Sequence, residues 1–224
     1  MKFVVTAGPT REHLDPVRFL SNPSTGKMGF AVARAAARAG HDVTLVAGPV
    51  ALATPKGVAR VDAVSARDVL AAVEAALAAV KDAPDGVALV MTAAVADWRP
   101  ATCAAKKLKK SAMSGTLKLV RNPDVLKTVR AKTRTWKRKP VLVGFAAETG
   151  EPTAEAARKC REKGLAMVVA NDVTQPGAGF GVDTNRVTFV LADGTLEPLP
   201  LMTKDAVARR IVEKCRTFGG GGGI

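Results

Sequence analysis

Short apolar runs alternate along the chain with longer segments in which apolar residues recur every three or four positions. Five of the runs are rich in β-branched residues and end in glycine, proline or polar residues; they occupy residues 2–7, 42–47, 87–92, 141–145 and 165–170. Runs of this kind are typical of strands that are buried on both faces of a parallel sheet. The segments between them predict helices, in the order expected of βαβ units.

Amphipathic helices are predicted between and after these runs. The segment 26–39 is rich in alanine and is followed by Gly40, a common helix stop. Ser65 is an N-cap candidate for the next helix, and an apolar stripe with helical spacing follows it. Three further helices are predicted over residues 123–133, with Pro123 in the first turn, 153–164 and 203–217.

A hairpin and a long irregular segment complete the pattern. Residues 187–191 and 196–199 predict two antiparallel strands joined by an Asp-Gly turn. Residues 97–120 do not follow the alternation of strands and helices, and loops of that length are usually functional or mobile. The pattern predicts an α/β fold: a Rossmann-like, doubly wound, mainly parallel sheet with a C-terminal β-hairpin. We expect a single domain over residues 1–218 and a flexible glycine-rich tail over 219–224.

Composition narrows the class of protein. With 224 residues, 47% of them hydrophobic, the chain is long enough to bury one sizeable core. It has no apolar run of about 18 residues and no secretory signal layout, so we expect a cytoplasmic protein without a membrane partner. Its cysteines, Cys103, Cys160 and Cys215, are far apart and not near either histidine. This spacing disfavours a zinc site or a disulfide framework and predicts reduced, non-catalytic thiols.

The net charge points to anionic partners. A formal charge of +14 attracts polyanions, either nucleic acid or phosphorylated small molecules. Lysines and arginines cluster at residues 106–110 and 132–139, where the ordinary interpretation is a solvated loop. Platforms for single-stranded nucleic acid interleave aromatic side chains with basic ones. Aromatic residues make up only 4% of this chain, so we expect no nucleic-acid partner; a basic nucleic-acid-binding module stays as the alternative.

Small and polar residues follow the predicted strands, where a parallel sheet presents its carboxyl ends and usually binds its ligand. They stand at residues 8–11, 93–99, 146–149 and 171–172. The stretch from Ser24 to Lys27 opens a predicted helix, whose free N–H groups and dipole favour an anion. It is neither a Walker A loop nor a dinucleotide fingerprint. The spacing supports an anion site and an ordinary N-cap equally well.

Charged residues lie near the same predicted edge. Asp97 follows a buried strand directly, which favours a functional position over an incidental surface acid. Lys159 and Lys163 are four residues apart on a predicted helix and therefore share one face. A solvent-exposed basic stripe is also compatible with that spacing.

Seven segments, in this order, resemble phosphopantothenoylcysteine synthetase. They are TAGPTREHLDPVRFLSNPSTGKMGFAVA (6–33), AAVADWRPA (93–101), KLKK (107–110), RNPDVL (121–126), VGFAAET (143–149), ANDV (170–173) and GFGVDTNRVTF (179–189). The resemblance covers almost the whole chain and favours the bacterial, CTP-using branch over the eukaryotic, ATP-using one. It implies a ligase of coenzyme A biosynthesis that joins L-cysteine to 4′-phosphopantothenate. The carboxylate would be activated as an acyl-cytidylate with release of pyrophosphate, and CMP would leave when the cysteine amine attacks.

The resemblance also implies roles for individual residues. Asn22 would hydrogen-bond the acyl-nucleotide, and Lys107, on a mobile flap, would neutralise charge near the reacting carbonyl. Arg18 would reach the substrate of a neighbouring subunit, which implies a homodimer. The residues implied in binding the pantothenate arm are Ala93, Ala94 and Asp97. Those implied in nucleotide binding are Gly8, Ser24, Thr25, Gly26, Phe145, Ala146, Lys159 and Lys163.

Cofactor expectations come from the same resemblance. Mg²⁺ would be coordinated mainly by the triphosphate, with few protein ligands, and no metal-ligating residue is predicted. Bacterial members are often fused behind a flavin-dependent decarboxylase; because this chain starts at the synthetase strand, no flavin is expected. A Rossmann oxidoreductase is the second alternative. It would need a glycine fingerprint after Thr6 and, in the short-chain type, a catalytic tyrosine, and the sequence contains neither.

Overall fold

The computed structural model describes residues 1–109 and 115–220 and is built around an eight-stranded sheet. In spatial order its strands are β13 (Leu196–Pro198), β12 (Thr188–Leu191), β10 (Met167–Asp172), β9 (Val141–Glu148), β6 (Val87–Met91), β1 (Lys2–Ala7), β4 (Asp42–Ala47) and β5 (Val58–Asp62). The strands from β10 to β5 are parallel, whereas β12 and β13 pair antiparallel at one edge. Counted along the chain, the parallel strands follow the order of a doubly wound Rossmann sheet. The predicted fold class, including the C-terminal hairpin, is therefore confirmed.

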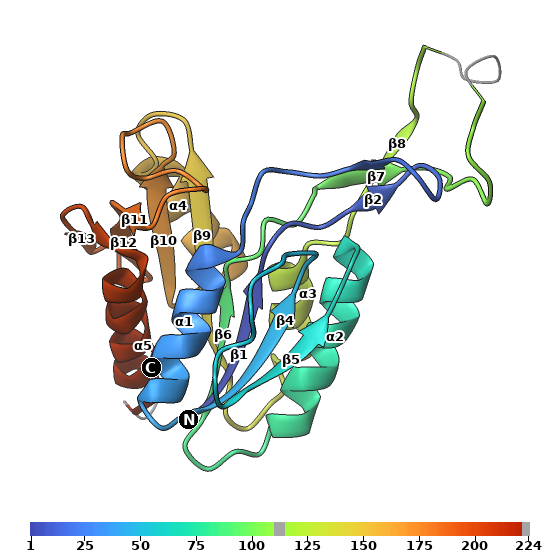
Figure 1. Ribbon diagram of the computed structural model, residues 1–224. Helices are drawn as coiled ribbons and strands as arrows, with labels where there is room; N and C mark the ends of the chain where they lie inside the picture. The colour runs from blue at the N-terminus through green and yellow to red at the C-terminus, as the bar shows by residue number, and fades with distance from the viewer. Residues whose placement is uncertain (110–114, 221–224) are drawn as a thin grey trace.

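Helices cover both faces of this sheet (Figure 1). They are α1 (Lys27–Arg38), α2 (Ala66–Val80), α3 (Val125–Lys132), α4 (Thr153–Lys163) and α5 (Lys204–Gly220). The core divides accordingly: Phe3 and Val5 of β1 pack with residues of α1 and α5, while Val4 packs with residues of α2, α3 and α4. Successive side chains of a strand point to opposite faces, so a strand covered on both sides must be apolar throughout. That requirement explains the continuous apolar runs in the sequence.

Two short hairpins form an arm that extends away from the sheet (Figure 1). One joins β2 (Glu12–His13) to β3 (Phe19–Leu20), and the other joins β7 (Trp98–Pro100) to β8 (Leu119–Arg121). The two hairpins contact each other through β2 and β7. We call these four strands, together with the turn between β2 and β3, the arm. The first hairpin lies between the first predicted strand and the first predicted helix, where no strand was predicted, and the second forms the base of the irregular segment 97–120.

Several predicted boundaries were wrong. The edge strand β5 was missed because most of it is exposed, which leaves no apolar run to detect. Helix α3 begins at Val125, because the Asp124 carboxylate caps it by accepting the Lys127 N–H at 3.0 Å; Pro123 therefore lies before the cap. Strand β10 starts two residues later than predicted, and β9 continues to Glu148.

One helix end was predicted correctly from local sequence signals and another was not. Ser65 caps α2 as predicted, in a reciprocal capping box with Asp68. Helix α5, in contrast, continues to Gly220, so Gly219 and Gly220 belong to the helix and not to the predicted tail. The rest of that tail, residues 221–224, lies outside the described residues. None of the helices in the described ranges combines the length and apolar character that a membrane span requires.

The three thiols differ sharply in exposure, which gives a first testable prediction. Cys103 is exposed, whereas Cys160 and Cys215 are buried. Burial raises the pKa of Cys160, and it raises the pKa of Cys215 to about 12. At pH 8 a thiol reagent should therefore label Cys103 quickly and the other two only after unfolding. Counting labels per native chain by mass spectrometry checks this; rapid labelling of a second thiol would contradict the packing described above.

Candidate functional site

Two adjoining cavities open at the carboxyl edge of the parallel strands. The larger, about 500 Å³, lies between the end of β6 and the helices α3 and α4. The smaller, about 150 Å³, lies between the start of α1, the end of β6 and a C-terminal loop. Both are lined by Ala93, Ala94 and Phe145, so they share a wall. Strand order reverses between β1 and β6, and this reversal is where open α/β sheets form their ligand crevice.

Backbone contacts hold the ends of β1, β4 and β6 together at this crevice. The Ala94 N–H donates to the Gly8 carbonyl at 2.9 Å, and Pro9 and Ala94 form a parallel bridge. Gly48 lies so close that a Cβ there would be 1.9 Å from the Pro9 carbonyl oxygen. Gly8 itself has a φ of 83°, which favours glycine. The predicted residue Gly8 therefore shapes the wall of the crevice through its backbone.

The Asn22 amide connects this wall to the start of α1. Its Nδ2 donates to the Ala94 carbonyl at 2.6 Å, and its Oδ1 accepts the Ser24 N–H at 3.1 Å. A primary amide carries two N–H hydrogens, and within the described residues only one of them is used. Asn22 thus lies beside both Ala94 and the helix start, although it is in the lining of neither cavity.

The start of α1 forms one wall of the smaller cavity, which Ser24, Thr25 and Gly26 line. Gly26 is the N-cap residue, with a φ of 78° and no side-chain hydrogen bond to the helix. No side chain therefore caps the first N–H groups of α1, and an N-cap by Gly26 leaves them open to a ligand. N–H groups at a helix start attract anions. Close packing keeps this start against the sheet, since a Cβ on Gly29 would lie 2.4 Å from the Thr92 hydroxyl.

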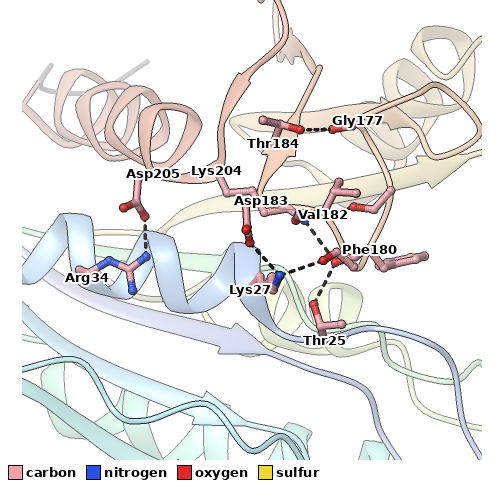
Figure 2. A network of polar contacts seen from close by, with 12 residues as sticks. Thr25, Lys27, Arg34, Gly177, Phe180, Val182, Asp183, Thr184, Lys204 and Asp205 are labelled. Atoms are coloured by element: carbon pink, nitrogen blue, oxygen red, sulfur yellow. Dashed lines mark hydrogen bonds and ion pairs between the residues drawn. The ribbon is translucent and has the colours of Figure 1, made fainter.

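A roof loop, residues 177–183, is tied over the start of α1 by lysine and threonine side chains (Figure 2). The Thr25 hydroxyl donates to the Phe180 carbonyl at 2.9 Å, and Lys27 contacts the Asp183 carboxylate at 2.7 Å. Lys204 is a buried residue with an exposed fraction of 6%. Its ammonium group donates to the carbonyls of Gly179, Phe180 and Val182. Burial and the nearby Lys27 lower its pKa. Sequence reasoning missed Lys204, because a lysine at a helix start carries no motif.

The predicted charged residues Asp97, Lys159 and Lys163 all line the larger cavity. Lys159 contacts Glu148 at 2.8 Å, and Lys163 contacts Asp124 at 2.9 Å. Lys159 is also 3.6 Å from the Glu155 carboxylate, so it is held by two carboxylates and Lys163 by one. Both lysine side chains are only partly exposed, at 26% and 22%, so the alternative of a solvent-exposed basic stripe is wrong.

The carboxylate beside Lys163 is itself strongly anchored. Asp124 is partly buried, which by itself would raise its pKa. The Lys127 N–H and the Lys163 ammonium outweigh burial and hold the pKa of Asp124 below its usual value. Asp124 therefore stays charged and fixes Lys163 at the cavity wall.

Phe145 and Ala146 have different surroundings despite being adjacent. Phe145 lines both cavities, whereas the Ala146 side chain is buried in the core on the opposite face of the sheet. Alternation along β9 causes this difference. Ala146 lines neither cavity, and the next residue of β9, Ala147, lines the smaller one.

Arg18 and Lys107 are not in the lining of either cavity. The Arg18 guanidinium binds the buried carboxylate of Asp15 at 2.5 Å and the Leu108 carbonyl at 3.0 Å. Asp15 also accepts the backbone N–H of Leu108 at 3.1 Å, and the Arg18 contact holds the pKa of Asp15 well below its usual range. Lys107 is exposed directly beside this clamp. Lys110, the last residue of the KLKK segment, lies outside the described residues.

Two buried amides lie at the site, and sequence reasoning placed Asn171 there but missed Asn185. Asn185 and Asn171 line the smaller cavity and are only 4% and 7% exposed. Asn171 directly follows an apolar run, and that position was the available signal. Asn185 follows no strand of the main sheet, so its position in the sequence gave no such signal. In the described part of the chain, no group of three or more His, Cys, Asp or Glu side chains is arranged to hold a metal ion.

Comparisons with known proteins match nearly the whole chain. A family model described as "DNA/pantothenate metabolism flavoprotein C-terminal domain" matches residues 1–218. The Coenzyme A biosynthesis bifunctional protein CoaBC of Vibrio parahaemolyticus is 45% identical over 215 residues, which is 95% of this chain and 51% of that protein. The chain therefore spans about half the length of the curated relatives it matches.

Solved structures agree with the fold. The crystal structure of the C-terminal domain of CoaBC matches with a TM-score of 0.76 and 40% identity, covering 97% of this chain and 94% of that one. A Cab2 mutant in complex with phosphopantothenate-cysteine matches with a TM-score of 0.79 at 15% identity, covering 98% and 86%. At that identity the second likeness concerns the fold alone.

Proposed function

Because the chain belongs to the family of DNA/pantothenate metabolism flavoprotein C-terminal domains, we propose that it is a ligase that joins L-cysteine to 4′-phosphopantothenate in coenzyme A biosynthesis. The observation that carries the proposal is the pair of adjoining cavities. One offers two lysines and the other a helix start, and they meet at Ala93, Ala94 and Phe145. Such a site suits two phosphorylated substrates whose reacting groups must meet.

The chemistry requires activation, because a bare carboxylate is a poor electrophile. We propose that the carboxylate of phosphopantothenate attacks the α-phosphate of CTP, giving an acyl-cytidylate and pyrophosphate. The cysteine amine then attacks the acyl carbon and releases CMP. Lys159 and Lys163 would stabilise the nucleotide phosphates in the larger cavity, while Asn22 would hold the acyl group beside Ala94. Catalysis of this kind depends on positioning and on charge stabilisation.

The proposal includes Mg²⁺ carried by the triphosphate, since phosphate oxygens are its usual ligands together with water. Amide formation exchanges no electrons, so no flavin step is included. Substrates that carry phosphate groups stay inside cells, and a cytoplasmic location follows from the proposal.

Pyrophosphate release tests the function directly. The purified chain is mixed with 4′-phosphopantothenate and Mg²⁺, with CTP or ATP, in the presence and absence of cysteine. We expect CTP to support pyrophosphate release more strongly than ATP, and product with a new amide bond to require cysteine. Absence of pyrophosphate and of amide product with either nucleotide would overturn the proposed function.

We further propose that the protein is a homodimer joined through the arm. Large apolar side chains are exposed there: Val17, Phe19, Leu20, Trp98 and Leu119 are between 36% and 57% exposed. A concentration of such residues on a projecting element marks an interaction surface. Arg18 lies on the same hairpin, which suits its implied role in a neighbouring site.

Charged substitutions on the arm should separate the subunits. The double variant Val17→Asp and Leu119→Asp is expected to shift the molar mass measured by light scattering from two chains to one. Leu196→Asp is the matched control, because Leu196 is 50% exposed but lies on β13 at the far edge of the main sheet. A wild-type mass of one chain, or a double variant that keeps the mass of two, would contradict dimerisation through the arm.

A further inference from the structure

Asn185 is a buried amide whose hydrogen-bonding capacity the protein does not use. Its residue is 4% exposed, and its Oδ1 is buried with no hydrogen-bond partner among the described residues. Buried side-chain amides are normally satisfied, because an unpaired one loses its hydration without compensation. The exception here lies in the wall of the smaller cavity. Its Nδ2 makes no hydrogen bond in the described part of the chain and is not among the buried atoms, so this donor is the end of the amide that a ligand in the cavity can reach.

Asn171 provides an internal comparison. It is equally buried and lines the same cavity, but its Nδ2 donates to the Ala178 carbonyl at 3.1 Å. Asn171 therefore holds the roof loop in place. Asn185 makes no such contact in the described residues, although its neighbour Thr184 does, through a hydroxyl that donates to the Gly177 carbonyl at 2.8 Å (Figure 2). Burial alone thus does not explain Asn185.

The charge of the cavity determines which ligand group fits. The start of α1 directs N–H groups at it, and Lys204 adds an ammonium group whose hydrogen bonds in the described residues go to neutral carbonyls. Lys27 is compensated by Asp183, so Lys204 supplies the excess positive charge. These features favour an anion. At about 150 Å³ the cavity is smaller than the roughly 300–1,000 Å³ typical of sites for whole organic ligands, so it suits one phosphate group.

We propose that Asn185 binds a phosphate group of a substrate in the smaller cavity, with its amide Nδ2–H donating to a phosphate oxygen. The unpartnered Oδ1 is an acceptor and cannot bind a phosphate oxygen, so the proposed contact is made by the Nδ2 donor. The proposal rests on the proposed function for the identity of the substrate. The phosphate belongs either to the triphosphate of CTP or to the phosphate monoester of 4′-phosphopantothenate, and the experiment distinguishes the two.

Kinetics of Asn185→Ala and Asn185→Asp test this site. Loss of a charge-assisted hydrogen bond should raise the KM of one phosphorylated substrate about tenfold in Asn185→Ala. Asn185→Asp should raise it further, because its carboxylate repels the phosphate. The KM of cysteine should not change. The substrate whose KM rises identifies the source of the phosphate. A KM within about twofold of wild type for both phosphorylated substrates in both variants would overturn the proposal.

Stability separates a ligand contact from a structural role. Asn185→Ala should melt at nearly the wild-type temperature without ligand, since no protein hydrogen bond is lost, whereas Asn171→Ala should melt lower. An equal loss in both variants would assign Asn185 to the scaffold and overturn the proposal. Thermal shifts with inorganic pyrophosphate alone, and with phosphate alone, provide a readout that does not need ligase activity. Stabilisation of wild type but not of Asn185→Asp supports the site even if the ligase assay is negative.

Discussion

Replacing Asn22 by aspartate is expected to lower the rate of amide formation by about two to three orders of magnitude, the loss typical of removing one hydrogen-bond donor from a transition-state site. The native Nδ2 lies 2.6 Å from the Ala94 carbonyl oxygen. An aspartate oxygen in that place would face another acceptor at close range, and it would bring negative charge to a site built for phosphates. The contact with the Ser24 N–H would survive, because Oδ1 is retained.

Single-turnover measurements with CTP, phosphopantothenate and cysteine check this prediction by separating pyrophosphate release from amide formation. Ser21→Ala is the control for disturbance of the same loop, since the Ser21 hydroxyl donates to the Thr10 carbonyl at 2.7 Å, whereas the Asn22 amide bonds to Ala94 and Ser24. It should keep most of the activity. Normal turnover in Asn22→Asp, or an equal loss of activity in Ser21→Ala, would show that Asn22 has no catalytic role.

The main sheet could be predicted because its strands are buried on both faces. Val4 and Val5 of β1 contact different helix layers, so both must be apolar, and the same demand recurs in β4, β6 and β10. The arm and β5 could not be predicted in this way. Many of their side chains are exposed, as with Phe19 and Val61. Exposed positions do not have to be apolar, so these strands show no periodic pattern of apolar residues. Short strands that pair away from the core are fixed by contacts distant in sequence.

The candidate site was predictable where it follows a strand of the sheet. Ala93, Ala94 and Asp97 come directly after β6, and the topology of a doubly wound sheet places that point at the crevice. Residues that reach the site from elsewhere were missed. Asn185 lies in β11 (Thr184–Asn185), outside the main sheet, and Lys204 begins α5, so their positions depend on the path of the C-terminal segment. No local pattern in the sequence indicates that path.

Replacing Lys204 by methionine is expected to lower both stability and ligase activity strongly. Three loop carbonyls, those of Gly179, Phe180 and Val182, would lose a charged donor inside the protein. Leaving buried acceptors without partners costs about 3 kcal/mol of unfolding free energy when the missing donor is charged. The roof loop would then be held over the start of α1 mainly through Thr25 and Lys27, and the smaller cavity would lose its excess positive charge.

Chemical denaturation and steady-state kinetics measure the two effects of Lys204→Met. Lys214→Met on the same helix is the matched control, because Lys214 pairs with Glu197 nearer the surface, and partly exposed pairs contribute about 1 kcal/mol or less. Lys204→Gln, which keeps an N–H donor without the charge, should fall between the two in stability. If the roof loop is held as inferred, kcat/KM should fall at least tenfold in Lys204→Met while Lys214→Met stays near wild type. Equal stability and kinetics in the two methionine variants would show that the loop does not depend on the buried ammonium group.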